Sequence, residues 1–144
     1  MLQPIAMITR VSNGSQGSES PELVEAWRDV LECHARVSHA LEKELQREHG
    51  LGVSEFEVLE RLMAKTEESC RMQELSDGVH LSQSALSRLV GRLEADGLVE
   101  RTMCTNDRRG IYAVITPAGR DRYEAARPTH RRVLAETMPA AAAR

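Results

Sequence analysis

The stretch "MQELSDGVHLSQSALSRLVGRLEADGLVERTMCTNDRRGIYAVITPAGR", residues 72–120, decides the fold. It begins with "MQELSDG", a helix of at most two turns, and a short connection at residues 79–81. Ser82 is then a typical N-cap for the helix "QSALSRLVGRLEADG", which Gly97 closes. The buried stripe of this second helix consists of Leu86, Leu89, Val90 and Leu93. Two apolar strands, "LVERTM" and "IYAVIT", flank the polar turn "TNDRRG" and predict a hairpin.

A short helix, a brief connection, a second helix and a hairpin with a basic tip form, in this order, a winged helix-turn-helix. A helix fits the major groove of DNA, where Ser and Gln can bond to base edges and Arg can bind guanine or phosphate. The outer face of the second helix therefore carries the candidate DNA contacts Ser82, Gln83, Ser84, Ser87, Arg88 and Arg92. Taken alone, this face is equally typical of a solvated helix, but the hairpin that follows favours DNA binding.

The hairpin tip supplies three further candidate DNA contacts, Asp107, Arg108 and Arg109. With the second helix in the major groove, the tip reaches the neighbouring minor groove, where narrow A·T stretches attract an inserted Arg. We expect Arg109 to insert, Asp107 to hold its guanidinium and the turn, and Arg108 to meet phosphate. A lone hairpin would explain the same residues as an ordinary polar turn.

Composition and charge agree with one mainly helical domain that faces a polyanion. The chain has 144 residues, 41% of them hydrophobic and only 3% aromatic, with a net charge of -3. Residues 1–77 hold 15 acidic and 8 basic side chains, whereas residues 78–144 hold 7 acidic and 11 basic. The opening "MLQPIAMITRV" lacks the basic start and apolar run of a signal peptide, and no segment is long enough to span a membrane. We expect a soluble cytoplasmic protein without a membrane partner.

The segments around the winged region read as a tail and two further helical parts. Residues 1–20 are polar and predict a mobile tail. Ser20 and Pro21 then begin a long helix to residue 50, and its apolar stripe predicts packing on a partner chain or within a single-chain bundle. Ser54 and Glu57 form a capping box for the next helix, and Thr116 with Pro117 begins a last helix with a bend near Pro128.

The sequence resembles a MarR-family transcriptional regulator, most specifically in residues 72–120 with the wing pair Asp107 and Arg109 and the following "ITPAG". The resemblance implies a mainly α fold with a small β-hairpin wing (α+β), in which residues 53–116 bind double-stranded DNA. It implies a homodimer held by residues 21–50 and by an apparently shortened C-terminal helix in residues 117–144. Such a dimer binds a pseudo-palindromic operator, usually represses transcription, and is released by a small anionic or phenolic effector or by an oxidant. Gly78 and His80 depart from the family pattern and are expected to loosen the helix-turn-helix slightly.

Three kinds of signal for DNA release were weighed on the residues of the chain: a small molecule, a redox change and a metal ion. For a small-molecule effector, a pocket between the dimer helices and the winged domain is expected, with Trp27, Arg28 and His39 as candidates; Trp27 also fits a core anchor. For a redox signal, Cys104 beside the wing and near Arg101 is the candidate thiol. A metal site would use Cys33, His34 and His39, but His34 and His39 are five residues apart and diverge, so no metal and no other cofactor is predicted.

Two other classes of function were compared with DNA binding. The chain has no phosphate-binding Gly loop, no His-Glu-x-x-His motif and no nucleophile motif, so an enzyme is not predicted. A winged helix can also serve as a protein-interaction module that binds no DNA. Salt separates the two readings, because a DNA reader that neutralises phosphates loses affinity steeply as ionic strength rises.

Overall fold

The computed structural model describes residues 20–103 and 110–139. In these residues the chain forms α1 (Pro21–His49), α2 (Val53–Met63), β1 (Ser69–Arg71), α3 (Met72–Val79), α4 (Gln83–Ala95), β2 (Val99–Met103), β3 (Ile111–Ile115) and α5 (Pro117–Thr137). The strands make an antiparallel sheet in the order β1-β3-β2. This is the mainly helical fold with a small β wing that the sequence predicts.

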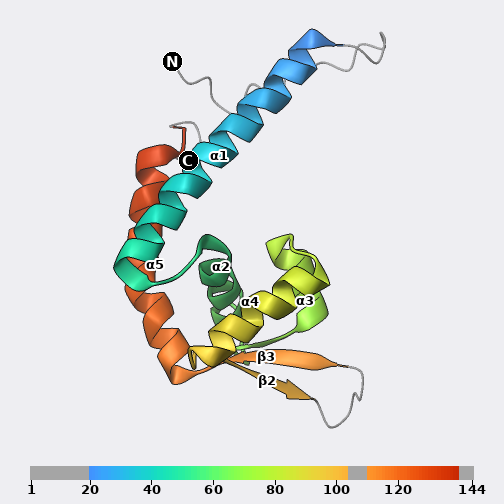
Figure 1. Cartoon of the computed structure of the whole chain (residues 1–144), viewed down its shortest axis with the longest axis vertical. Coiled ribbons are helices and arrows are strands. Elements are labelled where there is room, and N and C mark those ends of the chain that lie inside the picture. Colours follow the sequence, from blue (N-terminus) through green and yellow to red (C-terminus); the bar gives the residue numbers. More distant parts are fainter. Residues whose placement is uncertain (1–19, 104–109, 140–144) are drawn as a thin grey trace.

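The long helix α1 has two halves with different surroundings (Figure 1). Its C-terminal half lies along α5 and buries Val37, Leu41 and Leu45. Its N-terminal half extends away from the other elements, and there Leu23, Val24, Trp27 and Leu31 are 46–59% exposed. Gly50 ends the helix in the left-handed conformation, at φ 64°. The apolar stripe read from the sequence is therefore covered over only part of its length.

The core of the winged unit forms where α2, α3 and α4 pack above the sheet. Phe56 is fully buried and stacks on two side chains of α5, Tyr123 at 5.3 Å and His130 at 4.3 Å between ring centroids. These stacks attach α5 to the winged unit. The buried aliphatic residues around Phe56 include Leu59, Leu62, Leu75, Leu86, Leu93 and Ile115.

Polar contacts join α5 to the C-terminal end of α1. The hydroxyl of Thr129 donates to Glu48 Oε2 at 2.9 Å and lies 2.7 Å from His49 Nε2. Arg122 donates to the backbone carbonyl of His49 at 3.0 Å and so places a positive charge at the C-terminus of α1. Helix α5 continues through Pro128 without a break. None of the described helices has the length and apolarity needed to cross a membrane.

The start of α2 differs from the prediction made from the sequence. The helix begins at Val53 with Gly52 as its N-cap, so the prediction that Ser54 is the cap was wrong. The N–H of Val53 instead donates to Glu42 Oε2 of α1 at 2.9 Å. A carboxylate from another helix thus satisfies a free N–H group at this terminus, and a local sequence pattern cannot reveal such a partner.

The other helix termini follow the sequence more closely. Ser82 Oγ accepts from the N–H of Ala85 at 3.2 Å, and Thr116 Oγ1 accepts from that of Gly119 at 3.0 Å. His80 ends α3 in the left-handed conformation, at φ 57°. A Cβ atom on Gly78 would lie 3.4 Å from the guanidinium carbon of Arg61. Gly78 therefore lies close to the Arg61 side chain, and His80 is the C-cap of α3.

Candidate nucleic-acid interface

Helix α4 presents all six of the residues predicted for it on one solvent-exposed side. Its stripe of Leu86, Leu89, Val90 and Leu93 is buried. The exposed residues are Ser82, Gln83, Ser84, Ser87, Arg88 and Arg92. Short hydroxyl side chains at the start of the helix leave room for close approach of another molecule, while the arginines lie one and two turns further along.

Three of these polar side chains, Ser82, Gln83 and Ser84, already have partners in the protein. Ser82 caps the helix, and its hydroxyl lies 3.3 Å from that of Ser84. The amide of Gln83 donates to the side-chain carbonyl of Gln73 on α3. The Gln83 amide is therefore held across the two helices of the helix-turn-helix, while its carbonyl oxygen and second N–H make no bond to a described residue.

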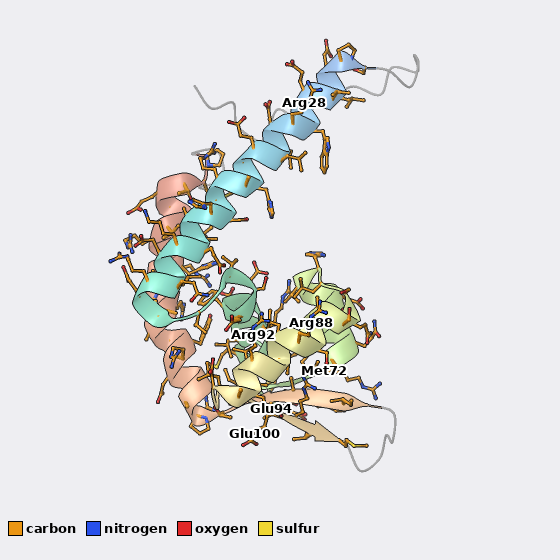
Figure 2. The ribbon with its side chains drawn as sticks, viewed as in Figure 1. Arg28, Met72, Arg88, Arg92, Glu94 and Glu100 are labelled. Carbon is orange, nitrogen blue, oxygen red and sulfur yellow. The ribbon has the colours of Figure 1, made fainter. Side chains whose placement is uncertain are left out.

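Arg88 and Arg92 carry the free positive charge of the helix. Neither guanidinium makes a hydrogen bond or an ion pair with any residue that the structure describes. Figure 2 shows both on the side of α4 that faces away from β2 and β3. They line a groove of about 300 Å³ whose opposite wall carries Glu42 and Glu55. Burial raises the pKa of Glu55, and the charge of Arg92 opposes this shift only in part.

The wing is described up to the base of its tip. Strands β2 and β3 pair from Val99 with Ile115 to Met103 with Ile111, and Met103 and Ile111 are exposed at the outer end. The predicted contacts Asp107, Arg108 and Arg109, and the candidate thiol Cys104, lie outside the described residues. Their roles stay predictions.

Arg101 joins the wing to α4, the second helix of the helix-turn-helix, here called the recognition helix. From the sequence alone, Arg101 stood out only as a neighbour of Cys104. The guanidinium of Arg101 donates to the backbone carbonyl of Ser87 on α4. Its backbone N–H donates to Glu94 Oε2 at 3.2 Å, and its Nε lies 3.9 Å from Glu94 Oε1. Side chains alternate along a strand, so Arg101 in "LVERTM" lies on the same side as the buried Val99. This alternation is the one sign in the sequence that Arg101 packs against the protein.

A second cavity, of about 570 Å³, lies between α1, α5 and the winged unit. Its wall combines apolar side chains with Cys33 and His34 from α1, Arg61 from α2, His80 from the end of α3, and His130 from α5. Burial raises the pKa of Glu57 in the same wall, and nearby Glu60 adds to the shift. The cavity lies where the effector pocket was predicted, but its lining residues differ from the predicted ones.

The three residues predicted for the effector lie elsewhere on α1. Trp27, Arg28 and His39 do not line the cavity, and Figure 2 shows Arg28 near the outer end of the helix. The helical period places Val30, Cys33, His34 and Val37 on one face of α1. Nothing in the sequence indicates that this is the face that lines the cavity.

The described residues include Cys33, Cys70, His34 and His39, but not Cys104, so the redox prediction stays a prediction. They hold no group of three or more His, Cys, Asp and Glu side chains placed to bind a metal ion. Cys70 is buried, and its pKa is raised by burial and by the adjacent Glu74. Cys33 is a half-buried free thiol.

Comparison with known proteins places this geometry among transcriptional regulators. Residues 49–110 match the family model described as the MarR family. A segment of 71 residues is 35% identical to the HTH-type transcriptional regulator MhqR of Bacillus subtilis and covers 49% of this chain and 48% of MhqR. The chain spans about half the length of the curated relatives it matches.

Two solved structures from Streptomyces coelicolor are similar over most of the chain. AbsC, a MarR family transcriptional regulator, is 32% identical, with a TM-score of 0.76 over 85% of this chain and 82% of AbsC. Sco3205, of the same family and solved in complex with DNA, is 28% identical, with a TM-score of 0.79 over 87% of this chain and 78% of Sco3205. Together with the winged helix-turn-helix described above, these likenesses show that the chain belongs to the MarR family of transcriptional regulators.

Proposed function

We propose that the protein is a sequence-specific, DNA-binding transcriptional regulator that acts in the cytoplasm. The observation that carries the proposal is the outer face of α4, where two guanidinium groups without ion-pair partners among the described residues follow a cluster of short hydroxyl side chains. This combination suits the major groove, because Arg binds guanine or phosphate and Ser accepts or donates at base edges. The DNA complex of Sco3205 supports the proposal.

Residues 53–116 form the DNA-binding unit in this proposal. Helix α4 enters the major groove, and the wing tip reaches the adjacent minor groove, where Arg109 inserts and Arg108 meets phosphate. Residues 21–50 and 117–144 serve dimerisation. The exposed Leu23, Val24, Trp27 and Leu31 on the outer half of α1 support this role, because a partner chain would cover them.

A homodimer would present two copies of α4 to a pseudo-palindromic operator and repress transcription by occupying it. The cavity of about 570 Å³ between α1, α5 and the winged unit is large enough for a small anionic or phenolic effector. Bound there, an effector would touch α1, α5 and the end of α3 together, and so would change the orientation of the winged unit relative to α1 and α5.

The test is fluorescence-polarisation binding to the DNA upstream of the protein's own gene, with a scrambled fragment for comparison, in about 50 to 200 mM salt. We expect selective binding that weakens steeply with salt. Arg88→Ala and Arg92→Ala should each cost about 1–3 kcal/mol of binding free energy without a change in melting temperature. Arg127→Ala is the matched control, since Arg127 is an exposed arginine of α5 paired with Glu124 at 3.9 Å.

Two outcomes of this binding experiment would contradict the proposal. If the wild-type protein binds neither fragment nor any other DNA at the lowest salt, the regulator proposal fails and the protein-interaction module takes its place. If Arg88→Ala, Arg92→Ala and Arg127→Ala weaken binding equally, DNA is bound by diffuse charge and not by the face of α4.

A further inference from the structure

Arg101 lies at the centre of β2, an edge strand of the sheet, and it connects the wing to the recognition helix. Its guanidinium reaches the carbonyl of Ser87, and its backbone N–H reaches the carboxylate of Glu94. Ser87 and Glu94 are about two turns apart along α4. Arg101 therefore contacts α4 at two points along the helix, and these two contacts fix the direction of β2 relative to the axis of α4.

Gly91 makes room for this contact. It lies on α4 between Ser87 and Glu94, and a Cβ atom on it would be 3.5 Å from Arg101 Nη2. That distance is an ordinary van der Waals contact, so alanine fits at position 91. A leucine side chain would need the space that the guanidinium of Arg101 occupies.

The charge of Arg101 is already used inside the protein. Its side chain is 31% exposed, and its buried Nε, which makes no hydrogen bond to a described residue, lies 3.9 Å from Glu94 Oε1. Arg88 and Arg92 on the same helix are exposed and have no such partners among the described residues. Arg101 therefore differs from the arginines that are available to phosphate.

We propose that Arg101 is a positioning residue for DNA binding, which sets the wing and the recognition helix at the spacing that lets both grooves be read at once. This rests on the proposed function. A wing that is free to swing must be ordered during binding, and ordering lowers the affinity, whereas a wing fixed in advance does not incur this loss. The loss falls on operator DNA, because scrambled DNA is held mainly through phosphate contacts.

The first measurement uses the free protein. Hydrogen exchange of residues 99–103 is compared among wild type, Arg101→Met, Gly91→Leu and Gly91→Ala. Arg101→Met and Gly91→Leu should speed exchange in β2, while Gly91→Ala should exchange no faster than wild type because alanine leaves the guanidinium in place. Unchanged exchange in both Arg101→Met and Gly91→Leu would overturn the proposal, whatever the protein does with DNA.

The second measurement is binding of the same four proteins to operator and scrambled DNA over a salt series. Arg101→Met and Gly91→Leu should each weaken operator binding about tenfold, and the double variant should be no worse than either single one. Gly91→Leu removes no charge, so we expect it to keep the wild-type salt dependence on scrambled DNA.

The result that would overturn the inference is different from the one that would overturn the proposed function. If Arg101→Met weakens operator and scrambled DNA equally and lowers the salt slope by about one, while Gly91→Leu binds like wild type, Arg101 is a phosphate contact. If Arg101→Met and Gly91→Leu lose affinity only in proportion to a lower melting temperature, the contact is merely structural. Absence of DNA binding by the wild type tests the proposed function alone, since the exchange measurement needs no DNA.

Discussion

His130 is a buried, titratable side chain at the point where α5 meets the winged unit. It is 7% exposed, stacks on Phe56, and has its Nδ1 2.6 Å from Nη1 of Arg131. Because a guanidinium only donates, Nδ1 accepts and the ring is neutral, with its proton on Nε2. Burial lowers the pKa of His130 and Arg131 lowers it further, while Glu60 opposes the shift.

The lowered pKa of His130 predicts a specific loss of stability in mild acid. As pH falls below about 6.5, the unfolded chain binds a proton at this histidine before the folded chain does, so the free energy of unfolding decreases. Urea unfolding at pH 7.5, 6.5 and 5.5 measures the effect, and His130→Gln should show a weaker pH dependence than wild type. Glu55 and Glu57, whose pKa values are raised, act in the opposite direction in both proteins. A wild-type-to-variant difference that is constant over this range would contradict the prediction.

Among the elements, the start of α5 has the least room for change. Thr116 accepts from the N–H of Gly119 and donates to the carbonyl of Gly97 at 2.6 Å. A Cβ atom on Gly119 would overlap the carbonyl oxygen of Leu98 and lie 2.8 Å from Ile115 Cγ1. The "ITPAG" motif is thus the place where α5 docks on the ends of two strands.

Gly119→Ala should therefore lower the free energy of unfolding by about 2–3 kcal/mol, because the backbone of Leu98 cannot move aside. The matched control is Gly91→Ala, in which the same methyl group meets only a side chain and helix propensity favours alanine by about 0.5–1 kcal/mol. Chemical denaturation of both variants decides the point. Equal stability of the two would show that the contact at Gly119 is not limiting.

The elements also show how far the sequence could be read. Helix α4 and the β2–β3 hairpin were predicted because their caps, stripes and turn are local patterns. Strand β1 was missed, since its three residues show no clear alternation and pair with β3 more than 40 positions away. The start of α2 was misplaced because its partner, Glu42, comes from α1. Non-local partners set both features.

At the scale of the whole molecule, the outer half of α1 should hold two chains together. Leu31 is 46% exposed on the outer half of α1, which extends away from the other described elements (Figure 1). Leu31→Glu would bury an unpaired charge in the proposed interface, which costs about 2 kcal/mol or more, roughly a thirtyfold rise in the dimer dissociation constant. Sedimentation equilibrium measures it, with the exposed Glu32→Gln on the same helix as the control. A monomeric wild type would contradict the prediction.

Part of the candidate site could be predicted from the sequence, namely the part that lies on a single helix. The face of α4 follows from periodicity within one helix, so Arg88 and Arg92 could be named from the sequence. The large cavity is formed by four separate elements, and which residues meet there depends on how α1 and α5 cross the winged unit. Cys33, His34 and His130 therefore became candidates for the effector pocket only with the structure.

The bond between the backbone N–H of Arg101 and Glu94 has a consequence for solubility. An edge strand with open N–H and carbonyl groups can extend the sheet of a second molecule, and repeated extension leads to aggregation. In β2 the central amide is occupied by a carboxylate from the neighbouring helix, and that carboxylate brings a negative charge to the edge. At the level of Arg101 the edge of the sheet is thus closed to pairing with a further strand.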